Sequence, residues 1–371
     1  MEKPLTIGVD IRDLRLAKTG TKTYLEEVCK AFGAMKERNI QFHFIDTFFS
    51  VYTGEHKILK WLEHFRYQFW KQITLPLKAW ARGCDIVFCT DNFVPLIHLG
   101  YKTIPVFHDA FFFENPEHYG KLWLKLYKKT AIPAAKRSPF IITPTEYAKN
   151  QIARHTGIPQ KQLAVVYEGP KSFEDDLLIQ NIQAIPANCP YLLHVGSMFK
   201  RKNIPALIYA FKKLKNTGYH DLKLVLAGAH APKKFSADGD LILKAIADSQ
   251  LENEVIFTGY LTDGELASVY RKALVYVFPS VNEGFGIPIL EAFKYKLPVL
   301  VANNTCLPEV GGDAVLQFNP FDPQDICDKI KMVLDDDELR LDLIKKGSQR
   351  LEHFSWKKTA EKLVQIFRKA V

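Results

Sequence analysis

Residues 278–291 read Phe-Pro-Ser-Val-Asn-Glu-Gly-Phe-Gly-Ile-Pro-Ile-Leu-Glu, and this stretch indicates the end of a strand, a glycine-rich turn and a helix. The run before it, residues 273–278, is apolar and β-prone, as expected for a strand buried on both faces of a parallel sheet. Pro288 suits a first helical turn, and apolar residues follow it at helical spacing. The pattern predicts Glu283 on the loop at the carboxyl end of the strand, and Glu291 about two turns further on inside the helix.

The residue types in this turn suit a phosphorylated and hydroxylated ligand. In open α/β sheets, ligands bind beyond the carboxyl ends of the strands. Gly284 and Gly286 allow the backbone to approach a ligand closely, and a helix N-terminus adds partial positive charge suited to phosphate. The carboxylates of Glu283 and Glu291 are acceptors suited to the hydroxyls of a sugar and of a ribose. We therefore expect a nucleotide-sugar site; the alternative is a solvated loop glutamate and a helix-surface glutamate.

The stretch 278–291 resembles the glutamate–seven–glutamate signature of the retaining glycosyltransferases of family four, which have the GT-B fold. The resemblance covers nearly the whole chain. In the second half, similar segments are His194-Val-Gly-Ser-Met-Phe-Lys-Arg-Lys-Asn203, Leu207-Ile-Tyr-Ala-Phe211, Phe257-Thr-Gly-Tyr-Leu261 and Leu307-Pro-Glu-Val-Gly-Gly-Asp313. In the first half, the segments in family order are Phe107-His-Asp109, Thr143-Pro-Thr-Glu146 and Tyr167-Glu-Gly169.

The order of strands and helices predicts two doubly wound α/β domains, and 371 residues is a comfortable length for two. Strands are predicted at 5–9, 41–47, 85–89, 103–107, 139–143, 164–167, 191–195, 222–227, 254–257, 274–278 and 298–301, with a helix over 24–35. A linker, 171–176 with 187–190, interrupts the pattern. The resemblance implies GT-B architecture: an acceptor-side Rossmann-like domain, 1–170, facing a nucleotide-sugar-binding Rossmann-like domain, 190–355, across a cleft. It also implies that the last helix, 356–371, completes the first domain.

Phosphate binding is expected at the turn after the strand 191–195. Arg201 and Lys202 follow the Gly196 turn and open a helix, so they combine charge with the helix dipole. The resemblance implies that Lys202 is the phosphate-binding lysine and that Arg201 shares the role, while Ser197 stands where many members carry an arginine. It further implies donor contacts from the turn residues and the nucleobase loop, which are Gly196, Ser197, Tyr260, Leu261, Gly284, Phe285, Gly286 and Glu291.

The first half is expected to supply the other wall of the site. Gly20 matches the first glycine of the family's glycine-rich loop, between the first strand and a helix, while Lys22 and Thr23 replace its second glycine and an arginine. His108 follows an apolar strand, where we expect a sugar contact with Asp109 orienting the ring. The resemblance implies catalytic roles for His108, Arg201, Lys202 and Glu283. It also implies retention by a same-face reaction in which the leaving phosphate takes the acceptor's proton.

Metal use is weighed on two Asp-x-Asp segments. Asp238 and Asp240 fall in a polar loop, and Asp335–Asp337 open a charged helix, where acidic residues favour the helix N-terminus. We expect capping and solvation at both segments rather than metal binding. The chain is therefore predicted to be metal-independent and to need no cofactor beyond the donor substrate.

The net charge is +9, but the basic residues are not interleaved with a nucleic-acid-binding motif, so we expect no nucleic-acid partner. Two basic aromatic segments, 56–71 and 121–129, are predicted to be helical. One hypothesis is that they rest on an anionic membrane surface carrying a lipid-linked acceptor. The alternative, which the sequence favours, is that the aromatic side chains pack inward and the lysines are solvated.

We expect a retaining hexosyltransferase that moves a sugar to a glycan or lipid-linked acceptor in surface polysaccharide or glycoconjugate synthesis. The motif pattern looks most like bacterial mannosyltransferases, which favours GDP-mannose; UDP-glucose and UDP-N-acetylglucosamine remain open as donors. Two further hypotheses are a nucleotide-sugar epimerase of the same fold and a non-catalytic nucleotide-sugar-binding subunit. With no apolar signal segment and no apolar run approaching 18 residues, we expect a cytoplasmic protein, with peripheral contact at the inner face of the membrane as an additional hypothesis.

Overall fold

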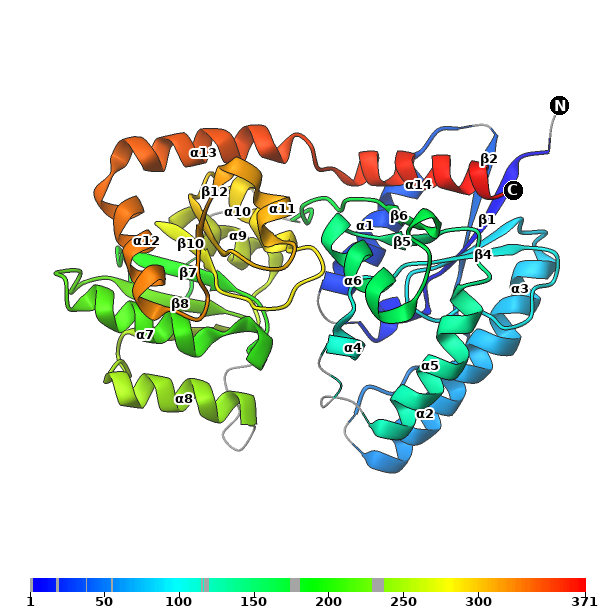
Figure 1. The fold of residues 1–371 in the computed structure, drawn as a ribbon, viewed down its shortest axis with the longest axis horizontal. Coiled ribbons are helices and arrows are strands. Elements are labelled where there is room, and N and C mark those ends of the chain that lie inside the picture. Colours follow the sequence, from blue (N-terminus) through cyan, green and yellow to red (C-terminus); the bar gives the residue numbers. More distant parts are fainter. Residues whose placement is uncertain are drawn as a thin grey trace. The chain divides into compact units, whose positions relative to one another are not determined.

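The computed structural model describes residues 3–17, 20–37, 39–54, 56–114, 116, 120–173, 181–228 and 237–371. The chain divides into two compact units, both built of strands and helices (Figure 1). The first unit joins Met1–Glu168 to Trp356–Val371, and the second is Gly169–Ser355. The part of the expected linker at 174–176 lies outside the described residues.

The first unit contains a four-stranded parallel sheet in the order β2-β1-β3-β4. Its strands are β1 (Leu5–Asp10), β2 (Ile40–Ile45), β3 (Ile86–Cys89) and β4 (Lys102–Pro105), and a separate parallel pair is β5 (Ile141–Thr143) with β6 (Leu163–Val165). Its helices are α1 (Gly20–Ala34), α2 (Lys57–Phe69), α3 (Leu75–Ala81), α4 (Phe111–Glu114), α5 (Lys121–Ala135), α6 (Glu146–Thr156) and α14 (Trp356–Ala370). In the register of β1 and β3, Asp10 lies opposite Cys89, so side chains that follow these strands meet at one edge of the sheet.

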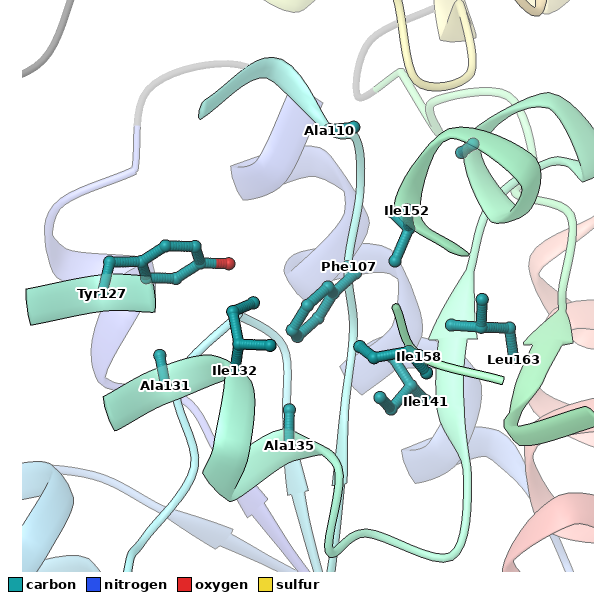
Figure 2. Close-up of a cluster of buried hydrophobic side chains, with 11 residues drawn as sticks. Phe107, Ala110, Tyr127, Ala131, Ile132, Ala135, Ile141, Ile152, Ile158 and Leu163 are labelled. Atoms are coloured by element: carbon teal, nitrogen blue, oxygen red, sulfur yellow. The ribbon is translucent and has the colours of Figure 1, made fainter. Parts of the chain in front are cut away.

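A hydrophobic core beside β5 holds the backbone next to His108. Figure 2 shows the Phe107 ring between side chains of α5, such as Ile132, and side chains of the β5 and α6 region, such as Ile141 and Ile152. Phe107 is 1% exposed. Because Phe107 is anchored in this way, the position of the next residue, His108, is determined by the core.

The C-terminal helix α14 packs within the first unit. The Phe367 ring lies 5.3 Å from the Phe88 ring and 6.1 Å from the Phe32 ring, between centroids. The Thr359 hydroxyl donates a hydrogen bond to the carbonyl of Tyr167 at 2.7 Å. The last helix therefore belongs to the core of a unit whose other residues come from the beginning of the chain.

The second unit contains a six-stranded parallel sheet in the order β12-β11-β10-β7-β8-β9. Its strands are β7 (Tyr191–Val195), β8 (Lys223–Ala227), β9 (Val255–Gly259), β10 (Val275–Phe278), β11 (Val299–Ala302) and β12 (Val315–Phe318). Its helices are α7 (Ile204–Lys215), α8 (Ala237–Ser249), α9 (Asp263–Lys272), α10 (Ile287–Lys294), α11 (Leu307–Gly311), α12 (Pro323–Asp335) and α13 (Asp337–Leu351). The strand order reverses between β7 and β10, which is where doubly wound sheets bind ligands.

The two parallel sheets confirm the α/β prediction, and each predicted strand overlaps an observed one. Two details were wrong. The strand β12 was not predicted, because Val-Leu-Gln-Phe is a very short run with no alternation. The helix predicted from residue 24 begins at Gly20 and ends at Ala34. In the described part of the chain, no helix has the length and apolar character needed to cross a bilayer.

Candidate functional site

The loop after β7 is tied to the loop after β10. A short 3₁₀ turn, Lys200–Lys202, precedes α7, and Asn203 adopts φ 54° at the start of that helix. The carbonyl oxygen of Arg201 accepts hydrogen bonds from the Val281 amide at 2.8 Å and from the Ser280 hydroxyl at 3.0 Å. These bonds fix the two loops that carry the predicted phosphate-binding and sugar-binding residues.

Three charged side chains meet between these loops. The Lys202 ammonium lies 2.5 Å from Oε1 of Glu283, and Nη1 of Arg201 lies 3.3 Å from Oε2 of the same carboxylate. Burial would raise the pKa of Glu283, but Lys202 and then Arg201 outweigh it and hold that pKa below its usual value. The trio carries a net charge of +1 in a setting that is only partly open to solvent, where an anion is attracted more strongly than in water.

His194 adds an unpaired acceptor beside this cluster. Its Nδ1 donates to the Val277 carbonyl at 3.0 Å, and its Nε2 has no hydrogen-bond partner among the described residues. Burial, and next the charge of Lys202, lower the pKa of His194 to about 4, so the ring is neutral at pH 7. A Cβ on Gly196 would lie 3.4 Å from Nε2 of His194 and 3.8 Å from the Lys202 ammonium, so a side chain at this position would contact both groups. Sequence reasoning passed over His194, although a histidine one residue before the strand's end was a visible signal.

The second glutamate is buried inside α10. Glu291 is 5% exposed, and its Oε2 accepts a hydrogen bond from the Tyr270 hydroxyl at 2.7 Å. Burial raises the pKa of Glu291, against the opposing effects of the Tyr270 hydrogen bond and of Lys171. Burial first, and then the charges of Glu291 and Glu283, raise the pKa of Tyr276. The alternative of two solvated surface glutamates is therefore wrong.

The remaining predicted donor contacts take different positions. Tyr260 follows β9 and is 75% exposed, which suits a ring that stacks on a ligand, while Leu261 and Ser197 are half-buried. Gly284 is half-buried in the turn. The Phe285 side chain is buried against the Phe354 ring at 5.9 Å between centroids, so only the backbone of Phe285 can meet a ligand.

In the first unit, His108 is held by partners other than the predicted one. Its Nε2 lies 3.2 Å from the Thr90 carbonyl, and its Nδ1 lies 3.6 Å from the Glu168 carboxylate. Burial would lower the pKa of His108, but Glu168 and then Asp109 outweigh it and raise that pKa above 6.5. The prediction that Asp109 orients the ring was wrong, because its carboxylate accepts the Phe111 amide at 3.0 Å.

Gly20 is not in a loop. It is the first residue of α1, it is exposed, and no atom lies within 4 Å of the position that a Cβ would take. The preceding Lys18 and Thr19 lie outside the described residues. Nothing in the local geometry therefore requires glycine at this position.

A buried charge network at the carboxyl ends of β1 and β3 was missed at the level of sequence. The Lys71 ammonium lies 2.6 Å from Asp10 and 2.6 Å from Asp91, and Nε1 of Trp70 donates to Asp10 at 3.1 Å. Lys71 is 1% exposed, although its segment was expected to carry solvated lysines. The register of the strands and the inward orientation of one helix face bring these residues together. No short sequence motif predicts the strand register or the buried helix face.

A cavity of about 390 Å³ opens beside this network, entirely within the first unit. Asp13, on its wall, has a pKa raised to about 7 by burial first and by Asp91 next. The lining combines aromatic rings with groups that form hydrogen bonds, and it consists of Arg12, Asp13, Leu16, Tyr52, Thr53, Gly54, Lys60, Glu63, His64, Tyr67, Gln68, Asp91, Asn92, Phe93, Phe112 and Trp123.

The acidic segments differ in their positions. Asp238 and Asp240 lie in the first turn of α8 rather than in a loop, which corrects that expectation; residues 229–236 before them lie outside the described residues. Asp336 caps α13 by accepting the Leu339 amide at 2.9 Å, as expected.

In the described ranges, one trio, Asp10, Cys89 and Asp91, has ligand atoms close enough to share a cation. The Lys71 ammonium already lies between its two carboxylates, so we assign no metal there.

Comparison with known proteins identifies the family. Residues 20–170 match the family described as Glycosyltransferase Family 4, and residues 175–350 match Glycosyl transferases group 1. The chain is 28% identical over 305 residues to O-antigen chain mannosyltransferase B of Escherichia coli, covering 78% of this chain and 77% of that protein. It is 29% identical over 282 residues to the serotype-specific mannosyltransferase WbdA of Escherichia coli, covering 74% of this chain but only 34% of that protein.

Among solved structures, sucrose-phosphate synthase from Thermosynechococcus elongatus superposes with a TM-score of 0.73 at 17% identity, covering 98% of both chains. That likeness extends to the whole fold. The two family matches follow one another along the chain, and each unit contains a parallel α/β sheet. The chain therefore belongs to the glycosyltransferases of family 4, which have the GT-B fold.

Proposed function

We propose that the protein transfers a mannosyl residue from GDP-mannose to a glycan or lipid-linked acceptor, with retention, in the synthesis of a surface polysaccharide. The names of its relatives, O-antigen chain mannosyltransferase B and WbdA, support the sugar and the process. The observation that carries the proposal is the charged trio of Arg201, Lys202 and Glu283 at the strand-order reversal of the second unit.

The trio suits the leaving group of this reaction. As the sugar departs, negative charge grows on the diphosphate, so cations fixed beside it stabilise the transition state more than the ground state. Lys202 and Arg201 supply those cations, and Glu283 holds both of them in position. Glu291, held by Tyr270, would accept a ribose hydroxyl, and exposed Tyr260 would stack on the base.

In the proposed step, the acceptor hydroxyl attacks the anomeric carbon on the face from which the diphosphate departs. The bond between the anomeric carbon and the phosphate oxygen breaks, and the acceptor proton passes to that oxygen. The products are the new glycoside and the nucleoside diphosphate. We propose no metal or cofactor, because the cations of Lys202 and Arg201 supply the charge. Activity should therefore persist after exhaustive chelation; loss under EDTA that Mg²⁺ or Mn²⁺ restores would contradict this part.

A thermal-shift panel tests the donor, since a ligand that binds the folded state raises the melting temperature by mass action. We expect GDP-mannose and GDP to stabilise the chain more than UDP-glucose, UDP-N-acetylglucosamine and UDP. Incubation with donor alone should leave the sugar unchanged, and nuclear magnetic resonance of the product should show the donor's anomeric configuration. Preference for a UDP-sugar, epimerised donor or an inverted product would each overturn the corresponding part of the proposal.

The two glutamates should separate by kinetics. If Glu291 binds ribose, Glu291→Gln should weaken the donor and the nucleoside diphosphate by similar factors, because both contain ribose; this loss appears mainly in KM. Glu283→Gln should lower kcat, because its carboxylate would face the positive charge that develops at the anomeric carbon, and it should change affinity for the sugar-free nucleotide less than Glu291→Gln does. Calorimetry measures the nucleotide affinity of each variant, and steady-state kinetics measure its kcat and KM. Equal weakening of the sugar-free nucleotide by the two variants would contradict this division.

We place the acceptor in the cavity of the first unit. Sugars are bound by aromatic faces together with carboxylate and amide groups, and this cavity offers Tyr67, Phe93, Asp91 and Asn92. Trp123→Ala should raise KM for the acceptor several-fold and leave nucleotide affinity unchanged. The control is Phe321→Ala, which alters a 74% exposed aromatic residue of the second unit, outside the cavity lining. Equal effects of the two variants would contradict the placement.

A further inference from the structure

One helical run of the first unit exposes an apolar stripe. The helix α2, the π-helical turn Trp70–Thr74 and α3 follow one another without a break from Lys57 to Ala81. Its other face is buried, with Trp70 and Leu75 in the core. Leu59 and Trp61 are exposed near the start of the run. Seven further exposed apolar residues recur every three or four positions and form the stripe, and they are Ile58, Leu62, Phe65, Phe69, Ile73, Leu77 and Trp80.

The exposed apolar residues of this stripe recur at a regular spacing, whereas single apolar residues scattered over a surface would not. Trp61, next to the stripe, is 68% exposed, Phe65 is 65% exposed and Trp80 is 63% exposed. On α5, Leu122 and Leu126 are also exposed. Large contiguous apolar patches on soluble domains mark a binding surface. The expectation that the aromatic side chains of segment 56–71 pack inward is therefore wrong for Trp61, Phe65 and Phe69, and correct for Trp70.

The same two helical runs are rich in basic residues. Lys57–Ala81 and α5 together contain nine Lys or Arg residues and one Asp or Glu residue. Lys71 is buried between Asp10 and Asp91, so eight basic residues remain outside that network. The single acidic residue, Glu63, is buried and paired with Arg12. A face that is both apolar and basic complements an anionic lipid surface. It would repel a second copy of itself.

We infer that the apolar stripe of α2 and α3, with the exposed start of α5, is a docking surface for an anionic lipid bilayer (Figure 1 labels these helices). The helical run lies in the interface, with Trp and Phe rings among the acyl chains and lysines at the headgroups. Residues of α2 and Trp123 of α5 also line the 390 Å³ cavity, so docking brings that cavity to the lipid headgroups. The surface stands independently of the proposed transfer reaction.

Vesicle co-sedimentation of the full chain without donor tests the surface. The chain should sediment with vesicles of phosphatidylcholine and phosphatidylglycerol, and much less with vesicles of phosphatidylcholine alone. Added salt should weaken binding by screening the lysines. The double variant Trp61→Ser with Phe65→Ser should bind at least about tenfold more weakly, because binding scales with inserted apolar area.

The matched control is Phe321→Ser with Leu341→Ser, two residues of the second unit that are 74% and 63% exposed; it should bind like the wild type. Absence of wild-type binding, or equal binding by the double variant and the control, would overturn the inference. Sedimentation velocity covers the other occupant: a dimer that the double variant dissociates, in a chain that ignores vesicles, would show an interface between copies instead. Because the assay contains no donor, failure of the proposed transfer reaction would leave its result unchanged.

Discussion

Lys202 shows how one buried side chain can depend on another. Its ammonium is almost inaccessible, with the residue 7% exposed, and a buried ammonium is costly unless a carboxylate lies close. Glu283 provides that carboxylate and receives Arg201 on its other oxygen. Removing any member of the trio therefore changes the electrostatics of the other two.

Replacing Lys202 with alanine should raise the barrier for transfer by roughly 2–4 kcal/mol, as for other residues that stabilise developing charge. The measurement is kcat at saturating donor. The control is Lys200→Ala, since Lys200 is exposed in the same turn and should keep near-normal turnover. Lys202→Met retains most of the side-chain volume and should lose turnover similarly. Full activity in both Lys202 variants would refute the phosphate assignment.

Asp13 should make stability depend on pH. Its pKa in the folded chain is raised to about 7 from 3.8, so the folded state binds this proton more tightly than the unfolded state. The free energy of unfolding therefore falls as pH rises from about 4 to about 7. Asp13→Asn cannot lose a proton, so the variant should not show this fall. Its free energy of unfolding should be close to that of the wild type at pH 4 and higher by on the order of 2 kcal/mol at pH 8. Urea unfolding at both pH values measures this; an equal effect at the two would show that Asp13 is not perturbed.

At the scale of the element, α10 depends on the glycine that precedes it. Gly286 has φ 98°, and a Cβ there would lie 3.0 Å from Cδ2 of Leu307. The turn therefore combines a backbone conformation that favours glycine with a position where a Cβ would lie tightly against Leu307. A side chain at position 286 would therefore strain the turn that precedes α10 and Glu291.

Gly286→Ala should lower the free energy of unfolding by about 2–4 kcal/mol, from left-handed strain together with overpacking. Gly218→Ala is the control, because Gly218 has φ 113° but nothing lies within 4 Å of its Cβ position. It should lose only the conformational part, about 1–2 kcal/mol. Chemical denaturation compares the two variants. Equal losses would mean that the Leu307 contact relaxes freely.

At the scale of the whole molecule, the core of the first unit needs both ends of the chain. Helix α14 contributes Phe367, which is 0% exposed, between rings that come from the first ninety residues. The predicted donor-site residues, by contrast, belong to the second unit apart from His108 and Gly20. The stability of the first unit and the proposed nucleotide binding thus depend on different parts of the chain.

Phe367→Ala should cost about 3–5 kcal/mol of stability, as is usual when a buried phenylalanine leaves a cavity. On the folded variant, calorimetry should give a nucleoside diphosphate affinity within about twofold of the wild type, because distant sites behave independently. Phe321→Ala, at a 74% exposed position, should change stability by less than about 0.5 kcal/mol. A large loss of nucleotide affinity in Phe367→Ala would contradict the separation.

Local sequence patterns determined the α/β class, the positions of the predicted strands and the turn that carries Glu283. These features depend on apolar runs, glycines and prolines that act within a few residues of one another. Pro288 and Gly286 mark the start of α10 in the structure as they did in the sequence. The segments around Lys202 and Glu283, which resemble those of the family, lie on two loops that meet in the structure.

Only the tertiary structure decided which side chains meet. Lys71 contacts Asp10 and Asp91, and Glu168 rather than Asp109 faces His108. The apolar stripe from Ile58 to Trp80 is likewise exposed because the opposite face of the same helices already fills the core. Periodicity predicts that a helix has two faces, but sheet order and strand register determine which face is buried. Contacts between residues about 60 or more positions apart follow from that order, and no local pattern contains it.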